Sequence, residues 1–166
     1  MRAVPVVTID YVINHPRIGA VESDTERGAQ LAVEHLRSNG RRVLGMVSSP
    51  SGRTVDEPRQ RGFRRAIADL TADVQHHIVW ADETLEGGAA GVRQLLERLP
   101  AVDGVLTYND VMAIGAVREL EDLGRAVPGE VAVIGVDDVA VSALVRPALT
   151  TVRIDREQMG RGRWTC

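Results

Sequence analysis

Carboxylate and amide side chains follow several short apolar runs in this sequence of 166 residues, each within three positions of the end of the run. The side chains concerned are Asp82, Glu83, Asn109 and Asp137. Asp accepts paired hydrogen bonds from neighbouring hydroxyls, Asn both donates and accepts, and Arg donates a planar fork. This mixture suits a neutral, hydroxyl-rich ligand such as a sugar, although an aromatic content of 3% is low for covering the C–H faces of a sugar ring.

Enzymatic and metal chemistry finds little support in the same residues. No Gly-x-Gly-x-x-Gly follows an apolar run, and the P-loop and Gly-x-Ser-x-Gly motifs are both absent from the sequence. The 4 histidines have no metal-ligand spacing with cysteine, and no lysine is present to form a Schiff base. On an extended backbone, Asp137 and Asp138 would point to opposite sides and would not form an acid–base pair. We therefore expect no enzyme activity, no metal site and no cofactor.

Strand and helix patterns alternate through the middle of the chain. Continuous apolar runs predict buried strands of a parallel sheet, and apolar residues at helical spacing predict the crossover helices. The predicted strands are 4–9, 43–47, 78–80, 102–107 and 131–136, and the predicted helices are 23–39, 58–70, 88–99 and 111–123. This order predicts an α/β fold with a doubly wound parallel sheet.

The polar residues therefore fall at the carboxyl ends of predicted strands, where open parallel sheets bind ligands. The alternative is that each of them only caps the helix that follows. Asp110 is best placed for that role at the start of helix 111–123. Capping explains Asp137 less well, because two successive carboxylates exceed the need of one cap and residues 139–145 are only weakly helical.

Charge and cysteine content limit the partners and the compartment. A net charge of −3 and a pI of about 5.8 argue against nucleic-acid binding by this chain, though not by a partner domain. The single cysteine, Cys166, excludes an internal disulfide and fits a reducing compartment. The first apolar run is too short for a signal peptide, and none approaches the ~20 residues of a membrane span. We expect a soluble cytoplasmic protein that does not enter a membrane.

Six stretches, spread over nearly the whole chain, carry a resemblance to a known family. They are VPVVTID, DTERGAQLAVEHLRSNGRRVLGMV, RQRGFRRAI, YNDVMAIGAVREL, GRAVPGEVAVIGVDDV and RPALTTVRID. In this order and with these gaps, they resemble the effector-binding region of LacI/GalR-type bacterial transcription regulators. The fold of that region is similar to the type I periplasmic sugar-binding proteins.

The resemblance implies two similar α/β subdomains that clasp a small effector. Residues 1–21 would be the end of the first subdomain, residues 22–149 the whole C-terminal subdomain, and residues 150–166 the crossover back. The usual helix-turn-helix, hinge helix and most of the first subdomain would be absent. RGRWTC stands where a helix normally continues after REQMG. These departures lead us to expect a fragment or a truncated gene product.

The resemblance also implies which residues bind the effector. Arg59 matches an arginine that contacts it, Asn109 matches the asparagine of the Asn-Asp motif, and Asp137 matches the first aspartate of Gly-[Phe/Tyr]-Asp-Asp. Val136 replaces the usual aromatic, which removes an expected stacking contact. The alternative for Arg59 is an exposed helix arginine like its neighbours. A variable position that often lines the pocket is occupied by Asp82 and Glu83.

The resemblance favours the effector-sensing part of a LacI-type DNA-binding transcriptional regulator, with a carbohydrate or nucleoside-like effector. We expect a homodimer in which residues 140–145 are partly buried, and contact with operator DNA only through a missing N-terminal domain. One alternative is a sugar-binding receptor module of a transport system, against which the absent signal peptide counts. Another is a small-ligand enzyme on a flavodoxin-like sheet, which nothing in the sequence requires.

Overall fold

The computed structural model describes residues 6–10, 15, 18–50, 57–70 and 74–161. The chain divides into two compact units, one formed by Met1–Asp24 with Ile154–Cys166 and the other by Thr25–Arg153. The aromatic residues Tyr11 and Trp164, and the single cysteine Cys166, lie outside the described residues.

The smaller unit contains a two-stranded parallel sheet. β1 (Val6–Ile9) pairs with β2 (Ile18–Val21), and the short helix α5 (Arg156–Arg161) belongs to the same unit. Beyond β1, Oδ1 of Asp10 accepts hydrogen bonds from both the backbone nitrogen and the hydroxyl of Ser23, each at 2.8 Å. These bonds fix the chain segment that follows β2.

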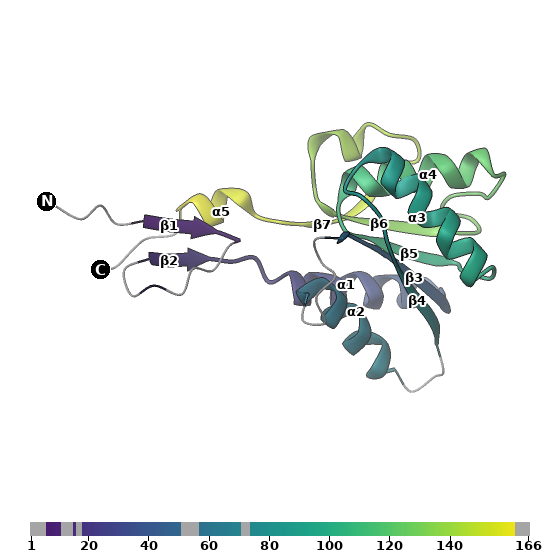
Figure 1. The fold of residues 1–166 in the computed structure, drawn as a ribbon. Coiled ribbons are helices and arrows are strands. Elements are labelled where there is room, and N and C mark those ends of the chain that lie inside the picture. Colours follow the sequence, from purple (N-terminus) through teal and green to yellow (C-terminus); the bar gives the residue numbers. More distant parts are fainter. Residues whose placement is uncertain (1–5, 11–14, 16–17, 51–56, 71–73, 162–166) are drawn as a thin grey trace, which may run out of the picture. The chain divides into compact units, whose positions relative to one another are not determined.

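The larger unit is built on a five-stranded sheet in the order β4-β3-β5-β6-β7, and every neighbouring pair of strands is parallel (Figure 1). The central strands are apolar along their length because both faces of the sheet are covered. The strands are β3 (Val43–Ser48), β4 (Gln75–Trp80), β5 (Gly104–Thr107), β6 (Ala132–Asp137) and β7 (Thr150–Arg153).

Two pairs of helices cover the two faces of this sheet: α1 packs with α2 on one face, and α3 packs with α4 on the other (Figure 1). Right-handed crossovers explain the arrangement, since the chain steps from β3 to β4 in one direction and from β5 to β6 in the opposite direction. The helices are α1 (Thr25–Ser38), α2 (Pro58–Ala68), α3 (Leu85–Arg98) and α4 (Asp110–Asp122).

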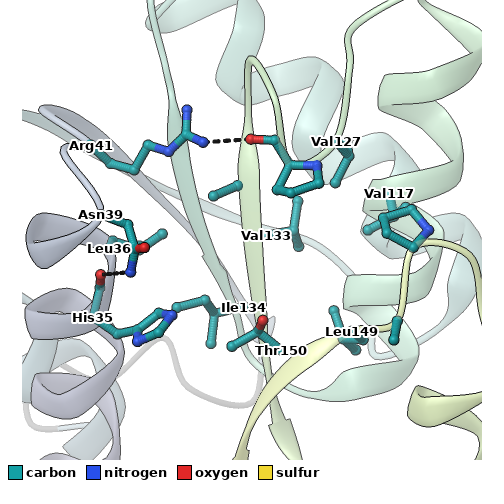
Figure 2. A pocket seen from close by; sticks show the side chains of 14 residues that line it. His35, Leu36, Asn39, Arg41, Val117, Val127, Val133, Ile134, Leu149 and Thr150 are labelled. Carbon is teal, nitrogen blue, oxygen red and sulfur yellow. Dashed lines mark hydrogen bonds between the residues drawn. The ribbon is translucent and has the colours of Figure 1, made fainter.

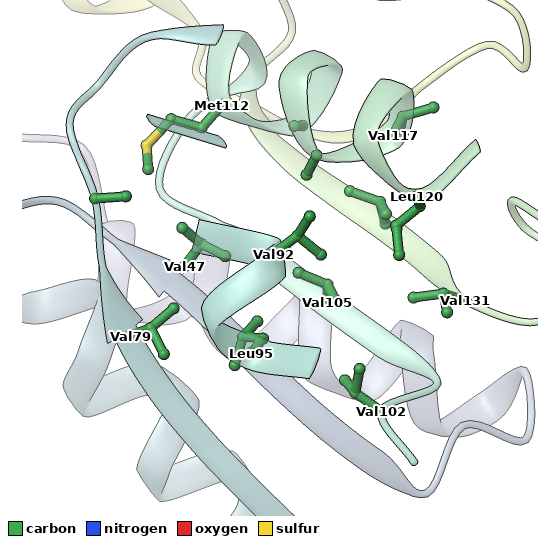
Figure 3. Close-up of a cluster of buried hydrophobic side chains, with 14 of the residues drawn as sticks. Val47, Val79, Val92, Leu95, Val102, Val105, Met112, Val117, Leu120 and Val131 are labelled. Carbon is green, nitrogen blue, oxygen red and sulfur yellow. The ribbon is translucent and has the colours of Figure 1, made fainter. Parts of the chain in front are cut away.

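The main hydrophobic core lies between the sheet and helices α3 and α4 (Figure 3). Val92 and Leu95 from α3 and Leu120 from α4 meet Val105 from β5, and all four are fully buried. Burying one such side chain stabilises the fold by roughly 1.5–3 kcal/mol. Gly115 allows the two helices to approach, because a Cβ there would lie 1.9 Å from the carbonyl oxygen of Leu85.

The strand order creates a switch point between β3 and β5. The chain leaves β3 toward one edge of the sheet, and it leaves β5 toward the other. The two connections therefore diverge beyond the carboxyl ends of these strands, which is the place where open α/β sheets bind ligands.

The doubly wound parallel α/β fold expected from the sequence is confirmed. Every predicted strand and helix has a counterpart, with boundaries that differ by a few residues. The weakly helical segment after β6 contains a single turn of 3₁₀ helix, η2 (Ala140–Ala143). β2, β7 and α5 were not predicted as elements.

Candidate functional site

The parallel register brings polar groups from several strands to one edge of the sheet. Ser48 ends β3, Thr107 ends β5 and Asp137 ends β6, and Val47 pairs directly with Thr107. Ser48 and Thr107 are fully buried, whereas Asp137 is half-buried. The switch-point edge is our name for this carboxyl edge of strands β3, β5 and β6.

Arg59 reaches this edge from the first turn of α2. Its guanidinium carbon lies 4.2 Å from the centroid of the Tyr108 ring, and its Nη1 lies 3.7 Å from Oε1 of Glu57. Its side chain is only 16% exposed, and its Nε is buried without a hydrogen-bond partner among the described residues. Arg59 is therefore not the exposed helix arginine of the alternative interpretation, because most of its side chain is buried.

The start of α2 is held by Glu57, whose carboxylate accepts from the backbone nitrogens of Arg59 at 3.1 Å and of Gln60 at 2.8 Å. Pro58 occupies the first helical turn, where its missing N–H is no loss. This cap fixes the direction in which the Arg59 side chain leaves the helix.

Gln60 is a polar residue of this region that sequence reasoning missed. It is 1% exposed, and its Nε2 donates to the hydroxyl of Ser48 at 3.2 Å. The bond links the start of α2 to the end of β3. No local signal marks Gln60, because a glutamine in a helix is usually solvated and its burial here follows from tertiary packing.

The expected roles of Asn109 and Asp110 at the start of α4 need a correction. Asn109, not Asp110, is the N-cap residue, and its Oδ1 accepts from the backbone nitrogen of Met112 at 2.9 Å. Its Nδ2 has no hydrogen-bond partner among the described residues, so the amide can donate to a ligand while the oxygen caps the helix. α4 begins one residue earlier than the predicted helix, which moves the cap back to Asn109.

Asp110 is fully buried and accepts three hydrogen bonds from distant parts of the chain. Its Oδ2 accepts from the backbone nitrogen of Val139 at 2.9 Å and from the hydroxyl of Ser142 at 2.7 Å, and its Oδ1 accepts from the hydroxyl of Thr151 at 2.5 Å. These partners surround the carboxylate and satisfy it, so Asp110 faces the protein interior.

The backbone at Asp137 and Asp138 is sharply turned and not extended. Their φ angles are 120° and 55°, in a region that non-glycine residues rarely adopt. Asp138 forms an ion pair of 3.6 Å with Arg153, and its backbone nitrogen donates to the hydroxyl of Thr151 at 3.2 Å. Such strain persists only where surrounding contacts impose it, and it clusters at ligand sites.

Asp82 and Glu83 follow β4 and are both exposed. Oε1 of Glu83 accepts from the hydroxyl of Ser49 at 2.5 Å, which connects this loop to the end of β3. The backbone carbonyl of Asp82 accepts from the nitrogen of Thr84 at 2.8 Å. The Glu83 carboxylate is thus tied to the switch-point edge through Ser49.

The aromatic groups near this edge differ from the expected pattern. Val136 is 4% exposed and forms part of the core, so the position before Asp137 offers no open face to a ligand. Trp80 ends β4 opposite Ser48, and its Nε1 is buried without a hydrogen-bond partner in the described part of the chain. The ring of Tyr108 is covered by the Arg59 guanidinium.

A separate cavity of about 270 Å³ lies at the opposite edge of the same sheet, near the amino ends of β6 and β7 (Figure 2). Figure 2 shows His35, Asn39 and Arg41 on one side of it and Val117 and Leu149 on the other. Arg41 donates to the carbonyl of Pro128, and Asn39 donates to the carbonyl of His35. These polar groups are engaged in holding local backbone.

Among the described residues, no group of three or more His, Cys, Asp or Glu side chains is arranged to hold a metal ion. Within the same residues, no helix is both long and apolar enough to cross a membrane. The groups assembled at the switch-point edge are hydrogen-bond donors and acceptors.

Known proteins provide an independent comparison. Residues 33–162 match the family described as "Periplasmic binding protein-like domain". The HTH-type transcriptional regulator GalR of Salmonella typhimurium is 38% identical over 155 residues, which are 92% of this chain and 45% of that protein. The ribose operon repressor of Halalkalibacterium halodurans is 32% identical over 149 residues, which are 90% of this chain and 44% of that protein.

A solved structure agrees with the sequence relatives. The LacI family transcriptional regulator from Enterococcus faecium, with bound ribose, superposes with a TM-score of 0.84 at 27% identity over 95% of this chain and 58% of that chain. The chain spans about half the length of the curated relatives it matches. It belongs to the periplasmic binding protein-like domain family, and the relatives that it matches in that family are LacI-type transcriptional regulators.

Proposed function

We propose that the unit Thr25–Arg153 is one half of an effector receptor within a LacI-type transcriptional regulator. The effector is a small, hydroxyl-rich molecule, either a carbohydrate or a nucleoside-like compound. It binds at the switch-point edge, where Arg59, Asn109 and Asp137 supply the main polar contacts and Asp82 and Glu83 line the rim. A second α/β subdomain completes the receptor and encloses the effector.

One observation supports this proposal above the others: the side chain of Arg59 is held over Tyr108 with a buried, unpartnered Nε. The amide nitrogen of Asn109 and the carboxylate of Asp137 follow neighbouring strands at the same edge. Together they offer donors and an acceptor at fixed positions, which is what recognition of vicinal hydroxyls requires.

The organisation of the chain follows from the same proposal. Residues 1–21 belong to the first subdomain, residues 22–149 form the second, and residues 150–166 cross back. The two compact units of the structure meet a few residues away, after Asp24 and after Arg153, since β7 completes the sheet of the larger unit. Contact with operator DNA is made by a separate N-terminal domain, and the regulator works in the cytoplasm.

The regulator acts as a homodimer, in which the segment around η2 faces the second copy. Val141 is 46% exposed and Leu144 is 75% exposed, although both are large and apolar. The two residues lie three positions apart around η2, and exposed apolar side chains that cluster mark protein–protein contacts.

Among the alternatives, a transport receptor is disfavoured because the relatives are regulators, and an enzyme is disfavoured for the same reason.

Binding of sugars and nucleosides tests the proposal. The protein to be tested is the longest polypeptide that the gene encodes, which we call the complete gene product. The probes are D-ribose, lactose, cellobiose and adenosine. Isothermal titration should detect at least one of them, and both Arg59→Ala and Asp137→Ala should weaken that binding. Operator binding that changes with the same probe supports a regulator, whereas a secreted gene product that binds no DNA supports a transport receptor.

A further inference from the structure

The buried carboxylate of Asp110 connects three segments that are far apart in sequence. Its donors come from the loop after β6 (Val139), from η2 (Ser142) and from β7 (Thr151). Asp110 itself begins α4. A single side chain therefore ties the first turn of this helix to the segment between β6 and β7 and to β7 itself.

The segment held in this way carries the Asp137 carboxylate at one end and the exposed apolar side chain of Leu144 at the other. It begins at Asp137, where the strained backbone turns out of β6, and it continues to Leu144, which is 75% exposed. The η2 part of the segment is also held from the other side, because the backbone nitrogen of Leu149 donates to the carbonyl of Ser142 at 2.9 Å. The position of Asp137 and that of the η2 surface thus depend on one set of bonds.

β6 is packed tightly against the same carboxylate. A Cβ on Gly135 would lie 2.2 Å from Oδ1 of Asp110, closer than any real contact, so only glycine fits at this position. Gly135 lies two residues before Asp137 on the strand. The Asp110 carboxylate therefore lies against β6 just before the turn and holds the loop just after it.

We propose that Asp110 is a positioning residue for the effector site: it holds the segment from Asp137 to Leu144 in the conformation that presents the Asp137 carboxylate to the effector. This inference rests on the proposed function, which assigns Asp137 to effector binding. It follows that a change at Asp110 alters effector affinity and the η2 surface together, although Asp110 faces the interior and reaches neither the effector nor a second subunit.

Substitutions at Asp110 separate positioning from a general contribution to stability. Asp110→Ala removes all three acceptor contacts. In Asp110→Asn, one oxygen still accepts from Val139 and Ser142, while the new amide group can donate to the hydroxyl of Thr151. Ser142→Ala removes a single donor. Leu120→Ala is the matched control, because it opens a cavity in the core of the same helix without touching this network.

The first measurement is amide hydrogen exchange in the complete gene product without added ligand. Asp110→Ala should accelerate exchange of the amides from Val139 to Leu144 by roughly tenfold or more, because their anchoring bonds are lost. Ser142→Ala should act in the same direction more weakly, and Asp110→Asn should restore most of the protection. In Leu120→Ala, any rise in the exchange rate of these amides should be no larger than the rise in the rest of the same unit.

The second measurement is isothermal titration with D-ribose, lactose, cellobiose and adenosine at a temperature where every variant is folded. Asp110→Ala should weaken binding of the active probe by roughly tenfold or more, Asp110→Asn should recover most of it, and Leu120→Ala should retain it. The inference is overturned if Leu120→Ala matches Asp110→Ala in both measurements, or if Asp110→Ala changes neither. A wild-type protein that binds none of the probes counts against the proposed function, while the exchange measurement still decides whether Asp110 holds the segment.

Discussion

The guanidinium carbon of Arg59 lies 4.2 Å from the centroid of the Tyr108 ring, which joins the first turn of α2 to the loop between β5 and α4. A cation over an aromatic ring is stabilised by about 0.5–1 kcal/mol at exposed sites and by about 2 kcal/mol when desolvated. The contact restricts the rotamers of a long side chain before any ligand arrives. Binding of a ligand to Arg59 therefore loses little further side-chain entropy, because the side chain is already ordered in the unliganded protein.

Replacing Arg59 should reduce effector affinity much more than it reduces stability. Arg59→Ala removes charge-assisted hydrogen bonds worth about 1.5–3 kcal/mol, so the dissociation constant should rise by roughly tenfold to a hundredfold. Isothermal titration of the complete gene product with the active probe measures the change.

Two further variants refine this prediction. Tyr108→Phe keeps the ring beneath Arg59 and should preserve most of the affinity. Arg61→Ala is the matched control on the same helix, since its guanidinium pairs with Glu26 on α1. An equal loss of affinity in Arg61→Ala would show that net charge matters and that the placement of Arg59 does not.

Asn109 should contribute separately to helix stability and to binding. Asn109→Ala removes the cap of α4 and should lower the free energy of unfolding by about 1 kcal/mol, because the backbone nitrogen of Met112 loses its acceptor. Asn109→Ser retains a capping oxygen but has no amide donor. Urea denaturation reports the first effect, and titration with the active probe reports the second.

We expect Asn109→Ser to unfold at nearly the wild-type urea concentration and to bind the probe about tenfold more weakly. Wild-type affinity in Asn109→Ser would mean that the side chain only caps the helix. This is the capping alternative that the sequence left open.

Leu144 should contribute to self-association. Leu144→Ser replaces a side chain that is 75% exposed in the single chain, and it should weaken a dimer by roughly tenfold or more because burial of a leucine is worth about 1.5–3 kcal/mol. Sedimentation equilibrium across a concentration series measures this change. Leu123→Ser, at another exposed leucine, should leave the dimer intact. A wild-type protein that stays monomeric at every concentration would contradict the proposal.

Asp103 should support the fold without affecting the site. Its carboxylate accepts from the backbone nitrogens of Arg42 and Val43, each at 2.9 Å, and so joins the amino ends of β3 and β5. Asp103→Ala should lower the free energy of unfolding by about 1–3 kcal/mol, measured by urea denaturation. Because these bonds lie at the opposite edge of the sheet from Asp137, probe affinity should stay at the wild-type value; a parallel loss would mean that the two edges are coupled.

The sequence predicted the layers of the fold well, because buried parallel strands and amphipathic helices leave different apolar periods. The helix face of Ala29, Ala32, Val33 and Leu36 is an example, since every residue of that face is buried in the structure. β7 was not predicted, because its sequence Thr-Thr-Val-Arg lacks a continuous apolar run at the sheet edge.

The candidate site was less predictable because its details depend on tertiary contacts. Which of Asn109 and Asp110 caps α4 is decided by partners of Asp110 that lie 29 to 41 positions away. The positive φ of Asp137 and the burial of Gln60 have the same kind of origin. Residue types at strand ends could indicate the region, while the roles within it required the structure.

The central claim is that an effector binds at the switch-point edge, and isothermal titration of the double variant Arg59→Ala/Asp137→Ala tests it most directly. D-ribose, lactose, cellobiose and adenosine are titrated into the complete gene product, with Leu123→Ser as a folded control. We expect that a probe bound by the wild type and by the control gives no measurable heat with the double variant. A double variant that binds this probe with the wild-type dissociation constant would contradict it.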